Sequence, residues 1–277
     1  MKIIDSFTFF NEFDILELRL KYLNDVVDYF IISESNYTHA GKLKPYYLDE
    51  FLPKIPKNIL DKIITIKYEP DISLLNFDTI VENYSPESSH WKIEKGQREY
   101  IIEYIRQNMN IFSLDDILMV SDVDEIPKKE AVKTFKNFPI EDYLCSAIAL
   151  ECKMFYYNFT TYNTNFWAGT VCSDILNFSN NGISFFRTNR FALHFLKDAA
   201  WHFSYFGGYS NIKTKLESFA HQEFNTNDYK DEKVLEHCIL NKINLFDDKQ
   251  FLDYEFEKYP DELKSIIIEV FSKEYYV

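Results

Sequence analysis

The sequence predicts an α/β protein in which a mixed, mostly parallel sheet is flanked by helices within a single domain. A strand pattern at residues 3–10, a helix pattern and a strand at residues 29–33 follow one another within 35 residues, which forms a βαβ unit and implies parallel strands. A further apolar strand at residues 117–120 ends abruptly in acidic residues. No Pro/Gly/Ser-rich linker divides the 277 residues, so we expect one continuous unit.

Composition supplies a large core and argues against nucleic acid as a partner. Hydrophobic residues make up 46% of the chain, and 26 Phe and 20 Tyr are among its aromatics. The 30 Lys and Arg face 44 Asp and Glu, which gives a net charge of −14, and no dense basic stripe appears. A chain this acidic needs a divalent ion, or a few well-aimed Arg and Lys side chains, to hold an anionic nucleotide.

The cysteines and the N-terminus point to a reducing compartment. Cys145, Cys152, Cys172 and Cys238 lack metal-site spacing, so we expect reduced, buried thiols. Residues 1–5 run directly into the first strand, without the apolar stretch of a signal peptide or membrane anchor. We therefore expect a soluble, cytoplasmic protein. Peripheral contact with a membrane stays open, and the sequence predicts no oligomeric state.

The remaining elements of the first half follow from apolar spacing. Asn11 is expected to cap a helix whose buried positions recur at helical intervals up to Leu23. Residues 63–68 predict a third strand, and residues 69–89, which are irregular and contain two prolines, predict a long loop. A helix should follow from about His90 to Gln107.

The second half is expected to alternate short strands with amphipathic helices. Phe166 to Thr170 suggests a compact aromatic loop, and the strand containing His202 is broken by paired glycines at 207 and 208. The other expected elements are a helix at 128–138, strands at 146–150 and 153–159, and helices at 211–221, 228–241 and 260–274.

The acids after the fourth strand form a candidate metal site. On an extended backbone Asp122 and Asp124 project to the same side while Val123 points into the core, so the two carboxylates can share one hard cation such as Mg²⁺ or Mn²⁺. Alternatively, these acids cap the next helix. His202, on an aromatic strand, is either a hydrogen-bonded core residue or a further ligand of that site.

Three more residues are candidates, each with a structural alternative. Glu34, at a strand end, could bind a ribose or base, or simply cap the loop after it. Arg98 could reach a phosphate or ribose, or lie on a solvated helix face. Trp167 could be a platform for a sugar ring or a plug in the core.

Four stretches together resemble a known family. They are Phe7–Glu12 with Leu18–Leu20; Glu34–Asn36 with Thr38, His39 and Gly41; Ser121–Pro127; and Trp201–His202 followed by Lys215–Leu216. This combination, from residue 5 to about 250, is similar to the family 17 glycosyltransferases, the family of β-1,4-mannosyl-glycoprotein β-1,4-N-acetylglucosaminyltransferases. The resemblance implies a GT-A-type fold, in which a Rossmann-like nucleotide-sugar half, residues 1–127, merges with an acceptor half, residues 128–277.

The resemblance also implies a chemistry. N-acetylglucosamine would pass from UDP-N-acetylglucosamine to a glycan acceptor with inversion, giving a β-linkage. Asp122 and Asp124 would hold Mn²⁺ or Mg²⁺ on the diphosphate, with His202 as a further ligand. Animal members carry a membrane anchor that this chain lacks, so a microbial or viral glycan is the expected acceptor.

Other roles follow from the same resemblance. Residues near Phe9, Asn11 and Glu34 would contact the uridine, with Arg98 and Asp122 also at the donor; Trp167 and Lys215 would contact substrate. A general base must accept the proton of the acceptor hydroxyl, and a carboxylate is the usual choice. Glu223 is the preferred candidate because the family pattern keeps an acid at the matching place; the rivals are Glu217 and Asp174.

Two other classes of protein fit less well. A phosphotransfer enzyme could use Asp-Val-Asp on two metals, but the six glycines form no phosphate-binding loop. A non-catalytic glycan-binding protein would keep the aromatic residues but has no need of the clustered acids. A transferase that uses another UDP-hexose is the remaining alternative.

Overall fold

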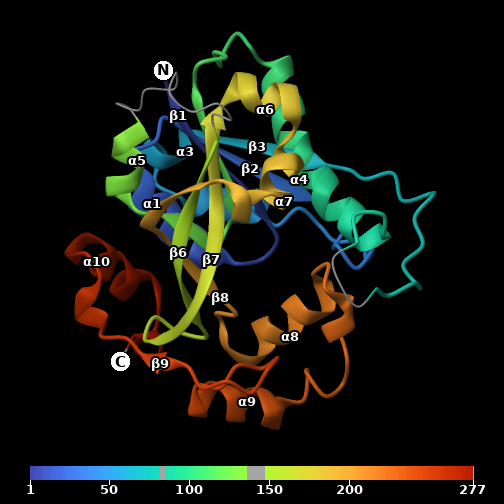
Figure 1. The fold of residues 1–277 in the computed structure, drawn as a ribbon, viewed down its shortest axis with the longest axis vertical. Coiled ribbons are helices and arrows are strands. Elements are labelled where there is room, and N and C mark those ends of the chain that lie inside the picture. Colours follow the sequence, from blue (N-terminus) through green and yellow to red (C-terminus); the bar gives the residue numbers. More distant parts are fainter. Residues whose placement is uncertain (82–84, 136–146, 277) are drawn as a thin grey trace.

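A curled mixed sheet runs through the computed structural model, which describes residues 1–81, 85–135 and 147–276 (Figure 1). The strands lie side by side in the order β3-β2-β1-β4-β7-β6-β8-β5, and β9 pairs with β7. Their bounds are Ile3–Phe9 (β1), Tyr29–Ser35 (β2), Ile63–Tyr68 (β3), Ile117–Asp122 (β4), Glu125–Pro127 (β5), Ile148–Tyr156 (β6), Thr161–Asp174 (β7), His194–Ser204 (β8) and Leu252–Asp253 (β9).

The sheet changes character at β4. From β3 to β4 all neighbouring strands are parallel, as the βαβ pattern predicts. Beyond β4 the β4–β7, β6–β7 and β5–β8 pairs are antiparallel, and only β6–β8 is parallel among them. The prediction of a mostly parallel sheet is therefore right for the first half alone. A short connection rather than a crossover helix joins β6 to β7, so these two strands must run in opposite directions.

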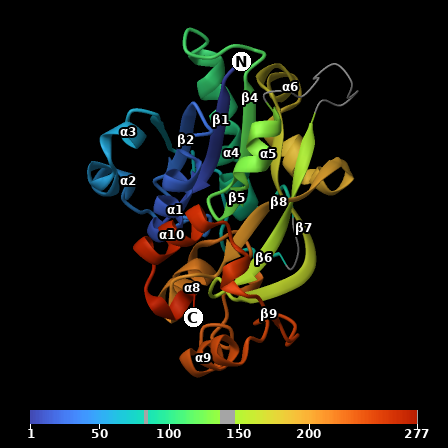
Figure 2. The ribbon, with the colours of Figure 1, turned by 90° about the vertical axis from the view of Figure 1, so that its left-hand side faces the viewer.

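Helices cover both faces of the parallel strands because β-strand side chains alternate. Ile3 and Phe7 pack in one core with α1 (Phe13–Leu23), α5 (Lys129–Phe135) and α10 (Asp261–Val270). Ile4 packs on the opposite face with α4 (Ser89–Gln107), α6 (Ile175–Asn181) and α7 (Ile183–Thr188). Figure 2 shows α10 beside α1.

The remaining helices lie at the margins of the sheet. The short α2 (Leu48–Phe51) and α3 (Lys57–Leu60) precede β3, whereas α8 (Gly208–Ser218) and α9 (Glu232–Asn241) form a separate apolar cluster below the strand ends (Figure 1). Short 3₁₀ turns at Leu52–Lys54, Arg190–Ala192, Gln222–Phe224, Phe256–Lys258 and Lys273–Tyr275 complete the described elements.

Several expected elements differ in their bounds. Residues 166–170 are not a loop but part of β7, and the two strands expected at 146–159 are one strand, β6, with an irregularity near residue 151. Glu12, not Asn11, stands at the N-cap of α1, and no side chain caps that helix. The last residues of the helix expected at 128–138, like Cys145, lie outside the described residues.

Two further expectations concern thiols and membranes. Cys152, Cys172 and Cys238 are free and buried, as predicted for three of the four cysteines. Within the described ranges, no helix has the length and apolar character needed to cross a membrane.

Candidate active site

A cavity of about 640 Å³ opens at the carboxyl ends of the parallel strands. Phe9 from β1, Ser35 from β2 and Asp122 from β4 line it on one side, and side chains of α4, α7, β8 and α8 close it on the others. Open α/β sheets bind ligands at this edge, and a volume of this size suits a small molecule rather than a polymer end alone. The cavity contains both aspartates of the Asp-Val-Asp stretch.

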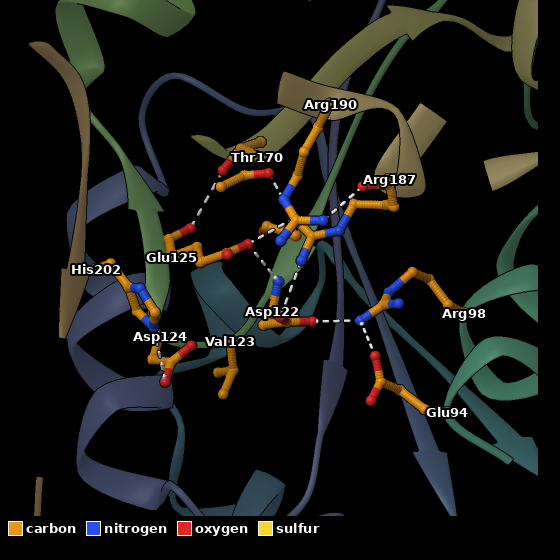
Figure 3. Close-up of polar contacts among 12 residues, drawn as sticks. Glu94, Arg98, Asp122, Val123, Asp124, Glu125, Thr170, Arg187, Arg190 and His202 are labelled. Carbon is orange, nitrogen blue, oxygen red and sulfur yellow. Dashed lines mark hydrogen bonds and ion pairs between the residues drawn. The ribbon is translucent and has the colours of Figure 1, made fainter. Parts of the chain in front are cut away.

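The two aspartates face different partners because the backbone turns between them. β4 ends at Asp122, and Val123 and Asp124 form the turn into β5, so the alternation expected of an extended strand does not apply. Asp122 accepts hydrogen bonds from Arg98 at 2.8 Å and from Arg187 at 2.9 Å. Asp124 accepts one from Lys215 at 3.0 Å. His202 Nε2 lies 3.5 Å from the same oxygen (Figure 3). Val123 is buried, as predicted.

A buried arginine of α1 fixes the backbone of this turn. Arg19 forms an ion pair with Asp5 of β1, with atoms 2.6 and 2.8 Å apart. Its guanidinium also donates to the carbonyl oxygens of residues 122, 123 and 125 at 2.8, 3.1 and 3.0 Å. Because both charged groups are fully buried, the turn is held by a rigid donor rather than by water.

Glu125 organises the other side of the turn. Its carboxylate accepts hydrogen bonds from the backbone N–H of Asp122 at 3.0 Å and from Arg187 at 2.7 Å (Figure 3). It also accepts one from Trp167 Nε1 at 2.8 Å. Gly169 makes room for this side chain, since a Cβ there would lie 2.9 Å from Glu125 Cδ. One fully buried acid thereby links β5, β7 and α7.

Electrostatics keep both aspartates ionised. Burial favours the neutral acid, but Arg187 and Arg98 hold the pKa of Asp122 well below its usual range. Burial likewise opposes ionisation of Asp124, and Lys215 and His202 reverse it, so its pKa is also far below the usual range. Burial lowers the pKa of Lys215, yet Asp124 and Glu12 raise it overall, which keeps the ammonium charged.

Arg190 is a cation that lacks a carboxylate partner. It donates to the backbone carbonyls of Ala168 and Arg187 at 2.7 and 2.6 Å, and among the described residues no Asp or Glu forms an ion pair with it. Burial, together with the neighbouring Arg187 cation, lowers the pKa of Arg190 to about 10. A cation held in this way favours the entry of an anion.

Asp124 and His202 fit a divalent cation better than Asp122 does. Adjacent ligands of an octahedral cation lie about 3 Å apart, close to the 3.5 Å between His202 Nε2 and Asp124 Oδ2. The other ring nitrogen of His202 is buried, and within the described part of the chain it has no hydrogen-bond partner. Over the described ranges no three His, Cys, Asp or Glu side chains gather as a ligand set, so a cation here would take its remaining ligands from substrate and water. The roles of Asp122, Asp124 and His202 as metal ligands stay predictions.

Two of the residues expected at the uridine do not line the cavity. Glu34 accepts hydrogen bonds from Lys44 at 2.7 Å and from the backbone N–H groups of Tyr47 and Leu48 at 2.6 and 3.1 Å. The capping alternative is therefore observed for Glu34, and its contact with the uridine stays a prediction. Asn11 lies beside the cavity without lining it, whereas Phe9 does line it.

The predicted substrate-binding residues line the cavity, whereas the predicted general base does not. Arg98, Trp167 and Lys215 line the cavity. Glu223 does not; its Oε1 lies 2.7 Å from Nδ1 of His221, which does line the cavity.

The rival bases lie elsewhere. Glu217 forms an ion pair with Lys230, and Asp174 caps α6 at the end of β7 that pairs with the start of β4, the end opposite Asp122. Neither side chain lines the cavity. The base assignment to Glu223 stays a prediction.

Several cavity residues with charged or titratable side chains had no role assigned from the sequence, among them Glu12, Arg187, Arg190 and His221. Glu12 was visible as part of the Phe7–Glu12 stretch, and Arg19 as part of Leu18–Leu20, but neither had a role assigned. Arg187 and Arg190 lie on short elements that show no periodic pattern, and Arg187 is 65 positions from its partner Asp122. No local signal in the sequence could have paired them.

Comparison with known proteins gives one extended match and several partial ones. A family model described as Glycosyltransferase family 17 matches residues 1–266. The β-1,4-mannosyl-glycoprotein 4-β-N-acetylglucosaminyltransferases of rat and human are each 26% identical over 139 residues. That stretch is 50% of this chain and 24% of each relative, so the match spans about a quarter of the relatives' length.

Similarity to solved structures is weak. Mannose-6-phosphate isomerase from Helicobacter pylori superposes with a TM-score of 0.34 at 11% identity, over 71% of this chain and 86% of the isomerase. Mouse xyloside xylosyltransferase 1 superposes with a TM-score of 0.29 at 10% identity, over 70% and 76% of the two chains. Scores this low are not evidence of a common fold.

Proposed function

This chain belongs to glycosyltransferase family 17, and from that premise we propose that it transfers N-acetylglucosamine from UDP-N-acetylglucosamine to a glycan acceptor, with inversion and a metal-assisted leaving group. The observation that carries the proposal is the cavity at the strand ends, where three arginines and one lysine converge on the Asp-Val-Asp turn in a chain of net charge −14. Family membership supports a GT-A-type arrangement of nucleotide-sugar and acceptor halves. The relatives' names support N-acetylglucosamine as the sugar.

The cations of the cavity suit a diphosphate. Arg190 has no ion-pair partner among the described residues, and Arg98 and Arg187 each bind Asp122 through one nitrogen, Nη2. These side chains and Lys215 can therefore donate hydrogen bonds to phosphate oxygens without first breaking the fold. As the bond between the sugar and UDP breaks, negative charge gathers on the leaving diphosphate, where the arginines stabilise it.

A divalent cation would be held by Asp124 and His202. Such an ion supplies Lewis-acid stabilisation to the departing diphosphate. The protein's own part is to keep Asp124 ionised through Lys215 and to hold His202 by its pairing with Glu125 across β5 and β8. Asp122 would position Arg98 and Arg187 for the same phosphates.

We propose that the Glu223–His221 pair accepts the proton of the acceptor hydroxyl. Glu223 does not line the cavity, but its carboxylate accepts from Nδ1 of His221 at 2.7 Å, which leaves Nε2 as the proton acceptor. A carboxylate that orients an imidazole in this way raises its basicity in the transition state. Glu223→Gln should lower kcat about a hundredfold or more with little change in the Kd of the donor; an unchanged kcat would place the base elsewhere.

The test of the donor site is calorimetric binding of UDP-N-acetylglucosamine, UDP-glucose, UDP-galactose and GDP-mannose, each with Mn²⁺ and with a chelator. We expect UDP-N-acetylglucosamine to bind most tightly, only with metal, and at least tenfold more weakly to Asp124→Asn. Asp253→Asn is the matched control, because that exposed acid of β9 pairs with Lys242 and does not line the cavity.

The pattern of binding separates the alternatives. If another UDP-sugar bound most tightly, the proposed transferase function would stand and that sugar nucleotide would replace UDP-N-acetylglucosamine as the proposed donor. Metal-independent binding that Asp124→Asn leaves intact would contradict the cation site. If no nucleotide-sugar bound under any condition, a glycan-binding protein without a donor site would be the better description.

A further inference from the structure

A row of aromatic rings leads from the cavity to the surface of the protein. His202 and Trp167 line the cavity, with ring centroids 5.3 Å apart. Trp167 contacts Phe191 at 6.0 Å, Phe191 contacts Phe166 at 6.1 Å, and Phe166 contacts Phe195 at 4.9 Å. The five rings come from β7, β8 and the 3₁₀ turn at residues 190–192, so three separate segments of the chain build one continuous row.

The outer part of this row is exposed to an unusual degree for phenylalanine. The exposed fractions are 49% for Phe166, 48% for Phe191 and 37% for Phe195. An aromatic cluster left open to water costs solvation free energy, and such clusters mark binding surfaces more often than chance packing. Here the cluster is continuous with a cavity rather than isolated on a convex face.

Arg190 covers the inner part of the row. Its guanidinium lies 5.0 Å from the ring centroid of Trp167 and 4.7 Å from that of Phe191. The outer rings, Phe166 and Phe195, are therefore the ones presented to a ligand. Thr164 and Asn165, which are both exposed, precede Phe166 in β7. The hydroxyl of the first and the carboxamide of the second can exchange hydrogen bonds with the hydroxyl groups of a ligand.

We propose that this row is an acceptor subsite for an oligosaccharide of at least three sugar units, whose terminal unit enters the cavity while the following units stack on the outer rings of Phe166 and Phe195. The proposal rests on the transferase function, since the acceptor hydroxyl must meet the donor within the cavity. Pyranose rings present flat C–H faces that pack on aromatic rings, and their hydroxyl edges suit the polar side chains beside Phe166.

The shape of the row favours a glycan over a lipid surface. The row is one ring wide and leads inward, which matches a linear ligand, whereas insertion into a bilayer needs apolar side chains spread over a convex face. A monosaccharide acceptor would reach only Trp167 and leave the outer rings without a function.

The experiment compares acceptor length with outer-ring variants. β-linked manno-, chito- and cello-oligosaccharides of one to four units are titrated calorimetrically into wild type, Phe166→Ala, Phe195→Ala and Phe185→Ala. Phe185 is the matched control: it is 54% exposed on the neighbouring α7, and its ring contacts the buried Phe186 at 5.1 Å instead of the row. Phe166→Leu, which keeps the apolar volume without the ring, replaces Phe166→Ala if the latter fails to fold.

We expect wild-type affinity to rise from the one-unit to the four-unit ligand in at least one series. Each outer-ring variant should weaken four-unit binding by roughly three- to tenfold and reduce the gain with length, while Phe185→Ala matches wild type. Equal affinities for one and four units, or equal losses in Phe185→Ala, would overturn the proposal. The proposal would also be overturned if the outer-ring variants bound phosphatidylcholine–phosphatidylglycerol vesicles less well than wild type but kept wild-type affinity for the oligosaccharides.

A separate donor titration distinguishes this failure from failure of the transferase function. If UDP-N-acetylglucosamine binds wild type and no oligosaccharide does, the acceptor subsite is wrong and the donor site stands. If oligosaccharides bind along the row but no nucleotide-sugar binds, the subsite stands on a protein that is not a transferase.

Discussion

Arg19 supports the candidate site without lining its cavity. It is fully buried, yet it carries a charge, and its donors are divided between the Asp5 carboxylate and three carbonyls of the Asp-Val-Asp turn. A buried ion pair is a weak source of net stability, because desolvation offsets most of the attraction. Its value here is positional, since it holds the backbone from which Asp122 and Asp124 project.

If the role of Arg19 is positional, substitutions of Arg19 and Asp5 should affect the free energy of unfolding and the UDP-sugar affinity differently. Arg19→Met leaves Asp5 buried without its counter-charge, so we expect the free energy of unfolding to fall by about 3–5 kcal/mol in urea titrations. In Asp5→Leu/Arg19→Met both charges are gone, and most of that stability should return. UDP-sugar affinity should stay low in the double variant, because the carbonyls of the turn still lack their donor. If the double variant bound like wild type, Arg19 would serve stability alone.

At the scale of elements, the site depends on how closely β7 approaches β5. Gly169 lies where a Cβ would come 2.7 Å from Cys152 Sγ and 2.9 Å from Glu125 Cδ. We expect Gly169→Ala to cost about 1–3 kcal/mol of unfolding free energy and to weaken donor binding, because displaced Glu125 loosens its contacts with Asp122 and Arg187.

A second substitution separates the two effects of Gly169→Ala. Adding Cys152→Ala removes the sulfur and should recover part of the stability, but the contact with Glu125 persists and so should the loss of donor affinity. Recovery of both quantities together would show that Glu125 is not the residue displaced. Thermal unfolding and donor calorimetry on the same samples make the comparison.

The first turn of α4 predicts a pH effect. His90 is buried against Phe77, with ring centroids 5.5 Å apart. Burial lowers its pKa from 6.5; the nearby Glu223 opposes the shift and His39 adds to it. The folded state therefore binds the proton less readily than the unfolded state, so the free energy of unfolding should fall as pH drops below 6.5 and level off below the folded pKa.

Comparison with His90→Asn isolates this group from the other histidines. Each unit of pKa difference is worth about 1.4 kcal/mol, so urea titrations between pH 5.5 and 7.5 can resolve it. Stability of the variant should depend less steeply on pH across this range. A difference between the two proteins that stayed constant with pH would mean that His90 contributes packing only.

These elements also show what a sequence can and cannot predict. β1 to β4 were predicted because buried parallel strands are short apolar runs, and α4 because its apolar positions keep helical spacing. β7 was missed because its middle carries Thr164, Asn165 and the exposed Phe166, which break both alternation and apolarity. The Asp-Val-Asp turn was found from its acids, but its arginine partners depend on tertiary packing that no local pattern records.

At the scale of the molecule, the donor and acceptor halves expected from the sequence share one core. The largest apolar cluster extends from Ile3 to Phe271, and the strands of the first half pair with those of the second through β4–β7 and β5–β8. Division near residue 127 would separate each of these pairs. The cavity itself takes residues from both sides of that point.

We therefore expect the protein to unfold as one cooperative unit. Unfolding enthalpy is about 0.7 kcal/mol per residue near 60 °C, so the 277 residues should give a transition on the order of 190 kcal/mol. Its calorimetric and van't Hoff enthalpies should agree, and UDP-sugar with Mn²⁺ should shift the whole peak upward because ligand binds only the folded form. Two independent halves would instead give a van't Hoff enthalpy near half the calorimetric one, and ligand would move only the first half's transition. A fragment of residues 1–127 gives the complementary test: it lacks β7, the second neighbour of β4, and β8, the partner of β5, so it should show no cooperative transition of its own.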